Sequence, residues 1–142
     1  MDNLSIERVW EDVDFFEIEV IAQSDHIRAG VRSYTTAASI SELALQLASF
    51  PKTLNDTFLW KNGTKGDDST PFVSLEFWCK DKLGHIIVEV YMEVDDGASL
   101  SKHNCCFFIN TEPGVLNNFG KSLHLLNERG TGKKIVLYQH VG

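Results

Sequence analysis

The strongest constraint on the fold is a pair of alternating apolar segments that complement each other across a short turn. Residues 72–80 and 85–94 flank Asp81-Lys82-Leu83-Gly84, whose composition is typical of a turn. If Lys80 pairs with His85, one face of the hairpin contains only apolar cross-strand pairs: Val73 with Met92, Leu75 with Val90, Phe77 with Val88 and Cys79 with Ile86. Because a slip of one residue would turn all of these side chains to the opposite face, the pattern predicts the register together with the hairpin.

The same register places two acidic residues directly opposite each other on the second face of the hairpin. Glu76 pairs with Glu89, and like charges in that position destabilise a sheet. Aromatic, apolar and further acidic side chains surround this pair, namely Trp78, Ile87, Tyr91 and Glu93. If the face is exposed, we expect a protein-binding patch, because Tyr and Trp supply binding energy and acids steer basic partners. The alternative is that a helix covers the apolar members and that lysines such as Lys80 neutralise the acids.

Alternating residues predict strands elsewhere in the chain as well. The pattern favours strands over residues 15–22, 27–34, 103–110 and 134–139. The first of these directs Phe16, Ile18 and Val20 to one face, and Glu17 and Glu19 to the other.

Two helices are predicted from their end signals and apolar spacing. Ser39 and Glu42 have the spacing of a capping box, so we expect one helix to begin at Ser39 and to end before Pro51. A second helix opens at Thr111-Glu112-Pro113, stops at Gly130 and has a buried stripe of Leu116, Phe119, Leu123 and Leu126. We therefore expect a single globular α+β domain over residues 1–142, with a mainly antiparallel sheet and two helices packed on one face of it.

The formal net charge is −7, and the excess lies at the N-terminal end of the sequence. Residues 1–25 contain eight acids and one base, Arg8, whereas the remaining residues contain twelve of each sign. Such a chain should repel nucleic acid and anionic membranes. The acidic end is interpreted either as a solvated surface that aids solubility or as a surface for a basic partner.

Composition also predicts a location. The sequence does not begin with a basic segment and an apolar run, as a secretory signal would, and no apolar stretch is long enough to cross a bilayer. Three cysteines in apolar contexts, Cys79, Cys105 and Cys106, are typical of free thiols in a reducing compartment. We therefore expect a cytoplasmic protein.

No motif predicts a catalytic residue, a cofactor or a metal. The segment from Gly130 to Lys134 resembles the end of a phosphate-binding loop, but it follows a helix where a strand is required. His103 and Cys105 share a face of a predicted strand, yet zinc requires about four ligands and no second close pair exists. The doublets Asp67-Asp68 and Asp95-Asp96 favour turns over a cation site. The five histidines are scattered and no Gly-x-Ser-x-Gly segment is present, so we do not expect an enzyme.

Four further groups of residues form a pattern: Phe16-Glu17-Ile18-Glu19-Val20, Ile40-Ser41-Glu42-Leu43-Ala44 with Phe50-Pro51, Gly84-His85-Ile86, and Thr111-Glu112-Pro113 with Leu116 and Phe119-Gly120. Together they resemble a widespread set of small bacterial proteins that includes the WapI-like immunity proteins. The resemblance covers most of the chain and implies a small, acidic, cytoplasmic protein that neutralises a toxin, in many cases a basic nuclease. It assigns no individual residue a role in inhibition.

We therefore hypothesise an immunity protein that binds a basic toxin domain without catalysis. The expected contact residues are Glu76, Trp78, Glu89, Tyr91 and Glu93, with Asp12, Asp14, Glu17 and Glu19 as steering charges. One alternative is a small-molecule-binding or enzymatic domain, with His85, His103 or Cys105 in a cleft between sheet and helices. Another is a homo-oligomeric adaptor that uses the same patch on itself.

Overall fold

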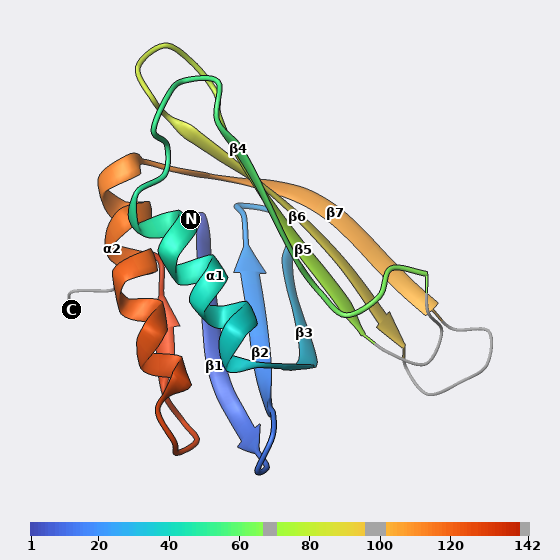
Figure 1. Cartoon of the computed structure of the whole chain (residues 1–142). Helices are drawn as coiled ribbons and strands as arrows, with labels where there is room; N and C mark the ends of the chain where they lie inside the picture. Colours follow the sequence, from blue (N-terminus) through green and yellow to red (C-terminus); the bar gives the residue numbers. More distant parts are fainter. Residues whose placement is uncertain (67–70, 96–101, 140–142) are drawn as a thin grey trace.

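The computed structural model describes residues 1–66, 71–95 and 102–139 (Figure 1). Within these ranges, eight strands form two antiparallel sheets of four strands each, and two α-helices and a short 3-10 helix accompany them. The α+β class is therefore confirmed. The expected single sheet is wrong, because pairing between segments that are far apart in the sequence divides the strands into two sheets.

Sheet A is built from the N-terminal strands and one C-terminal strand. Its order is β3-β2-β1-β8, and the bounds are β1 (Asn3–Glu11), β2 (Phe16–Gln23), β3 (Arg28–Thr35) and β8 (Lys134–Val136). The strands predicted over 15–22 and 27–34 are confirmed as β2 and β3 within one residue, whereas β1 was not predicted. The β1–β2 register shifts between Arg8 and Trp10, which marks an irregularity of the β-bulge type.

Sheet B contains the predicted hairpin. Its order is β4-β5-β6-β7, and the bounds are β4 (Thr57–Asn62), β5 (Phe72–Cys79), β6 (Ile86–Asp95) and β7 (Lys102–Thr111). The predicted register of β5 and β6 is confirmed at every pair, from Val73 opposite Met92 to Cys79 opposite Ile86. At the turn, the Lys80 N–H donates a hydrogen bond to the His85 carbonyl over 2.6 Å.

Helix α1 (Ala37–Ala48) begins earlier than predicted. Thr36, not Ser39, is the N-cap, and its hydroxyl accepts a hydrogen bond from the Ser39 N–H at 3.2 Å. The Ser39 hydroxyl instead accepts from the Trp60 indole N–H at 3.1 Å. The Ser39 side chain, which the local pattern predicted as the helix cap, therefore makes a tertiary contact instead.

Helix α2 (Pro113–Leu123) continues into a short 3-10 helix, η1 (His124–Asn127). Pro113 occupies the first turn, as predicted, and Glu112 is the N-cap. The Thr111 hydroxyl, which was expected to be a cap, accepts a hydrogen bond from the Tyr138 hydroxyl at 3.2 Å. The predicted apolar stripe is confirmed, because Leu116, Phe119, Leu123 and Leu126 are all buried.

One core is shared by the inner faces of both sheets and by the two helices. Figure 1 shows α1 and α2 side by side, with the strands of sheet A behind them and sheet B to one side. The helices approach closely at Gly120, where an added Cβ would lie 2.5 Å from the Ala48 nitrogen. Because both helices lie on the core side, they leave the outer faces of both sheets uncovered. None of the helices within the described ranges is long and apolar enough to span a membrane.

Candidate functional site

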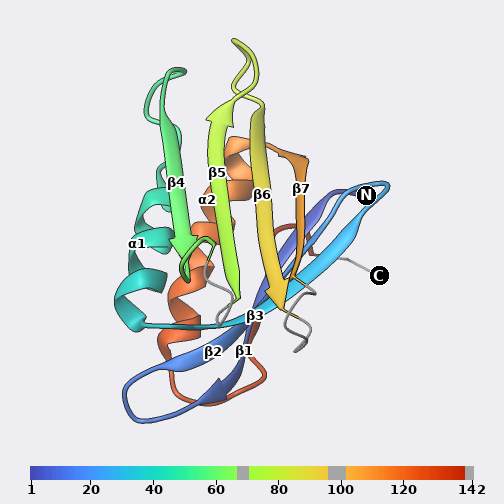
Figure 2. The same ribbon diagram turned by 90° about the vertical axis from the view of Figure 1, so that its right-hand side faces the viewer.

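The outer face of sheet B is the side of β4–β7 that points away from the core. Figure 2 shows this face in the foreground, with α1 and α2 behind it. The alternative in which a helix covers its apolar members is therefore wrong. The face is formed by Thr57, Leu59 and Lys61 of β4, Ser74, Glu76 and Trp78 of β5, Ile87, Glu89 and Tyr91 of β6, and Cys106, Phe108 and Asn110 of β7.

Glu76 and Glu89 face each other at the centre of this surface, as predicted. Their neighbours in the same cross-strand row are Leu59 on one side and Phe108 on the other. Neither carboxylate forms a hydrogen bond or an ion pair with another residue that the structure describes. Two like charges thus stand together between apolar neighbours, which is an unfavourable arrangement for the isolated chain.

Sheet A contains a second pair of opposed glutamates, and there the charges are balanced. Glu7 faces Glu19, and the row continues to Lys134 on one side and Arg32 on the other. The Arg32 Nε lies 3.3 Å from a carboxylate oxygen of Glu19. Because the same motif on sheet A is flanked by cations, the absence of such partners for Glu76 and Glu89 among the described residues is specific to sheet B.

Exposed apolar side chains surround the glutamate pair of sheet B. Trp78 and Phe108 contact each other edge to face, with ring centroids 6.2 Å apart, and Phe108 is 49% exposed. Leu59 is also among the exposed large apolar residues. Sequence reasoning missed Leu59 because β4 was not predicted. Phe108 could have been predicted from the sequence, because it alternates with the inward residues of the predicted strand over 103–110.

Glu93 differs from the other predicted contact residues because it is buried, with 6% of its surface exposed. Its carboxylate accepts hydrogen bonds from the Gly66 N–H at 2.8 Å and from the Tyr91 hydroxyl at 2.7 Å. The second bond, together with burial, raises the pKa of Tyr91 to about 12. Lys65 Nζ lies 4.7 Å from the centre of the Tyr91 ring. Glu93 thus anchors the segment after β4 and does not form part of the exposed surface.

The predicted steering acids lie away from this surface. Asp12 and Asp14 are exposed in the turn between β1 and β2, and Glu17 and Glu19 lie on the outer face of sheet A. The two predicted groups are therefore on different sheets. The reason is that each sheet turns its inner face toward the shared core, so their outer faces belong to separate surfaces.

The residues considered for a cleft are not brought together. His85 precedes β6 and His103 pairs with Val94 near its far end, so the two histidines lie at opposite ends of that strand. His85 Nδ1 lies 2.7 Å from the Asp81 carboxylate, and this hydrogen bond lowers the pKa of Asp81. Burial raises the pKa of the Cys105 thiol, which disfavours a reactive thiolate.

Metal ligands do not cluster in the part of the chain that the structure describes, where no three His, Cys, Asp or Glu side chains converge. The doublet Asp67-Asp68 and Asp96 lie outside the described residues. The segment from Gly130 to Lys133 leads into β8, and α2 ends at Leu123 and η1 at Asn127, so the prediction that Gly130 stops the helix is wrong.

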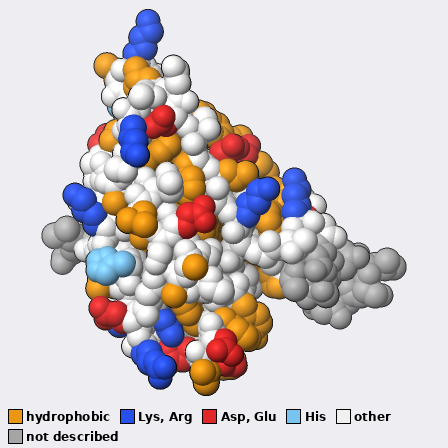
Figure 3. All heavy atoms as spheres, viewed as in Figure 1, with side chains coloured by type: hydrophobic (Ala, Val, Ile, Leu, Met, Phe, Trp, Pro, Cys, Tyr) orange, Lys and Arg blue, Asp and Glu red, His pale blue; other side chains and the backbone are white. Residues whose placement is uncertain are grey.

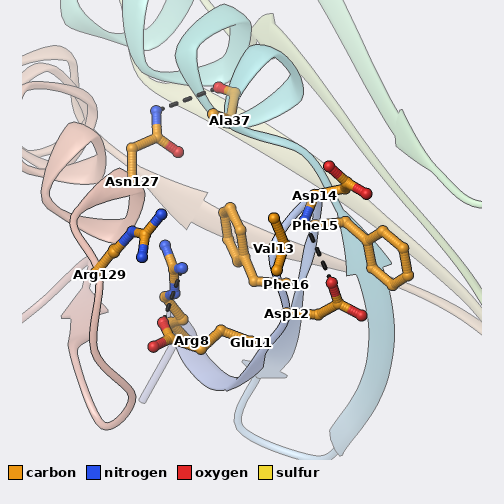
Figure 4. A pocket seen from close by; sticks show the side chains of 10 residues that line it. All are labelled: Arg8, Glu11, Asp12, Val13, Asp14, Phe15, Phe16, Ala37, Asn127 and Arg129. Carbon is orange, nitrogen blue, oxygen red and sulfur yellow. Dashed lines mark hydrogen bonds and ion pairs between the residues drawn. The ribbon is translucent and has the colours of Figure 1, made fainter.

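Figure 4 shows a hollow beside the turn between β1 and β2, with the Arg8 guanidinium at its base. Arg8 donates to the Leu126 carbonyl at 2.9 Å, lies 2.8 Å from the Glu11 carboxylate and stacks 4.0 Å above the Phe16 ring. Through its two terminal nitrogens, Arg8 joins β1 to η1 and to Glu11.

No protein-family model matches the chain, and no curated protein matches its sequence. The candidate site is therefore defined by its geometry.

Proposed function

We propose that this chain is an immunity protein that binds a basic bacterial toxin domain through the outer face of sheet B and neutralises it without catalysis. The observation that supports this function is the Glu76–Glu89 pair, which forms no hydrogen bond or ion pair with another described residue and has the exposed Leu59 and Phe108 beside it. A protein surface that presents a lysine or arginine would supply the missing positive charge.

The chemistry of the face suits such a partner. An arginine side chain placed over Glu76 and Glu89 would form charge-assisted hydrogen bonds, which are stronger than bonds between neutral groups. Trp78, Phe108 and Leu59 would surround the contact and exclude water from it, as apolar residues do around energetic centres of protein interfaces.

Net charge supports the same class of partner. The excess of acids lies in residues 1–25, and Asp12 and Asp14 are exposed in their turn. A negative field of this kind accelerates encounter with basic proteins. The assignment to toxin immunity, as opposed to another role in binding basic proteins, rests on the resemblance to WapI-like immunity proteins.

A tagged pull-down from the native cell, at low and moderate salt, tests the function. We expect one basic protein to co-purify with the wild-type chain, to be toxic when expressed alone and to be harmless when the chain is co-expressed. The double variant Glu76→Gln/Glu89→Gln should lose both capture and protection.

The matched control is Glu7→Gln/Glu19→Gln, which removes the opposed glutamates of sheet A. Because Lys134 and Arg32 flank these glutamates and balance their charge, the control should retain both activities. Protection that survives the loss of Glu76 and Glu89 would rule out sheet B as the binding face. A captured protein that is not toxic would rule out the immunity function.

A further inference from the structure

Three aromatic rings surround a hollow at the end of sheet A. Trp10 comes from β1, Phe15 from the turn after it, and Tyr34 from β3. The ring centroids lie 5.3 Å (Phe15–Tyr34), 5.8 Å (Trp10–Tyr34) and 6.4 Å (Trp10–Phe15) apart, in edge-to-face or tilted arrangements. The rings are 39% to 57% exposed, so this is an open apolar hollow on the surface.

Local backbone geometry creates this arrangement. The register shift in β1 places Trp10 opposite Glu17, and Glu17 is in turn opposite Tyr34. The cross-strand row on the outer face of sheet A is therefore Trp10–Glu17–Tyr34. Phe15 completes the hollow, because Phe16 turns inward under Arg8 while its neighbour points outward, as Figure 4 shows.

Carboxylates accompany the three rings. Glu17 lies between Trp10 and Tyr34 in the row, and within the described ranges it makes no hydrogen bond or ion pair. In Figure 4 the side chains of Asp12 and Asp14 point to the same side of the turn as Phe15, away from Arg8. Figure 3 shows acidic side chains beside hydrophobic ones at this end of the molecule, over the turn between β1 and β2.

Aromatic faces and carboxylates attract the same kind of ligand. The faces of Trp, Tyr and Phe rings bind cations through their quadrupoles, and nearby acids add to the attraction. An ammonium or a metal ion would retain its water in an open hollow, whereas a guanidinium is weakly hydrated and planar. It can stack on a ring while its N–H groups reach a carboxylate at the edge.

We infer that the hollow formed by Trp10, Phe15 and Tyr34 binds the side chain of an arginine presented by a protein, with Glu17 as the counter-charge. The openness of the hollow favours a side chain on a protein surface over an enclosed small molecule. The arginine site lies on sheet A and does not depend on the function proposed for sheet B.

Nuclear magnetic resonance titration of the full chain tests this site. The probes are N-acetyl-arginine amide and its neutral isostere N-acetyl-citrulline amide, at an ionic strength of about 0.15 M to screen long-range attraction. The Trp10 indole N–H reports on the arginine site and the Trp78 indole N–H reports on sheet B. We expect the arginine probe to shift the Trp10 signal saturably, with an affinity about fivefold higher than that of the citrulline probe.

Variants separate binding from folding. Tyr34→Leu and Glu17→Gln should each weaken arginine binding about threefold while the spectrum remains that of a folded protein. Trp78→Leu, which removes a half-buried aromatic side chain from the other sheet, should leave arginine binding at Trp10 unchanged.

Equal shifts by both probes, or binding that survives both sheet A variants, would overturn the site. Shifts confined to Trp78 would also overturn it while leaving the function proposed for sheet B intact. Tighter binding of tetramethylammonium than of arginine would show that the hollow takes a small quaternary ammonium ion instead.

Discussion

Glu76 and Glu89 illustrate how a single pair of like charges on a protein surface can oppose folding. Their cross-strand row contains no cation, since Leu59 and Phe108 flank the pair, whereas Glu7 and Glu19 are flanked by Lys134 and Arg32. Arrangements that lower the stability of the fold and form no compensating contact are expected at functional sites. Removing one charge from each pair should therefore have different effects on the stability of the isolated protein.

Glu89→Gln should stabilise the isolated protein, because it removes the repulsion from Glu76. We expect a gain of about 0.5 kcal/mol and a rise in melting temperature of about 2 °C, measured by thermal unfolding. Glu19→Gln is the control and should not stabilise, since Glu19 pairs with Arg32. A lower melting temperature for Glu89→Gln would show that its charge is compensated in solution.

Tyr91 gives a prediction for alkaline pH. The hydrogen bond to Glu93 raises the pKa of Tyr91 from 10.0 to about 12. Because the pKa is raised on folding, the associated stability is complete below the ordinary tyrosine pKa and is lost as pH rises through the folded value. Glu93→Gln should return the pKa toward 10.0, as measured by ultraviolet titration of tyrosinate. An unchanged titration would mean that this hydrogen bond does not form.

At the scale of elements, Gly120 fixes how closely α1 and α2 approach. Gly120→Ala should destabilise the protein by about 1–3 kcal/mol, because the new methyl group would meet the backbone of Leu47 and Ala48. Gly114→Ala in the same helix is the matched control, since nothing lies within 4 Å of its Cβ position. The control should be neutral or stabilising by up to about 1 kcal/mol. Denaturant unfolding distinguishes the two, and equal effects would contradict the close helix contact.

The hairpin of β5 and β6 could be predicted from its local pattern, whereas β1 and β4 could not. The register of the β5–β6 hairpin was predicted correctly, and its strand ends within one residue, because all of its inward pairs are apolar. In β1, the inward series of Leu4 and Ile6 continues to Arg8, whose partners lie in η1 and at Glu11. In β4, the inward Asn62 donates to the Ser33 hydroxyl and the Tyr34 carbonyl of the other sheet. Leu126 in η1 and the Ser33 and Tyr34 partners of Asn62 are distant in sequence, so the local pattern of β1 and β4 did not indicate that Arg8 and Asn62 point inward.

At the scale of the whole molecule, long-range strand pairing explains why only part of the candidate site could be predicted from the sequence. Glu76, Trp78, Glu89 and Tyr91 were predicted on one face because a single hairpin contains them. Their neighbours Leu59 and Phe108 depend on how β4 and β7 pair, which is long-range information. The same is true of the division into two sheets, which separates the acids of residues 12–19 from the hairpin face.

This separation gives a prediction for association with the proposed basic partner. Asp12→Lys/Asp14→Lys should slow association about tenfold at low ionic strength. The effect should shrink as salt is added, because these side chains are exposed and act at a distance. Stopped-flow mixing measures the rate, and a dissociation rate that changes as much as the association rate would show direct contact instead of steering.

Alternation along the strands of sheet B has a consequence for how a protein of this kind can diversify. Residues that fill the core alternate with residues that face outward, where the proposed partner would bind, so neighbouring positions have different requirements. Outward positions can exchange charge, size or aromatic character while the inward positions keep the scaffold unchanged. Recognition of a new partner can therefore arise by substitution at a few alternate positions, without a new fold and without prior loss of the old one.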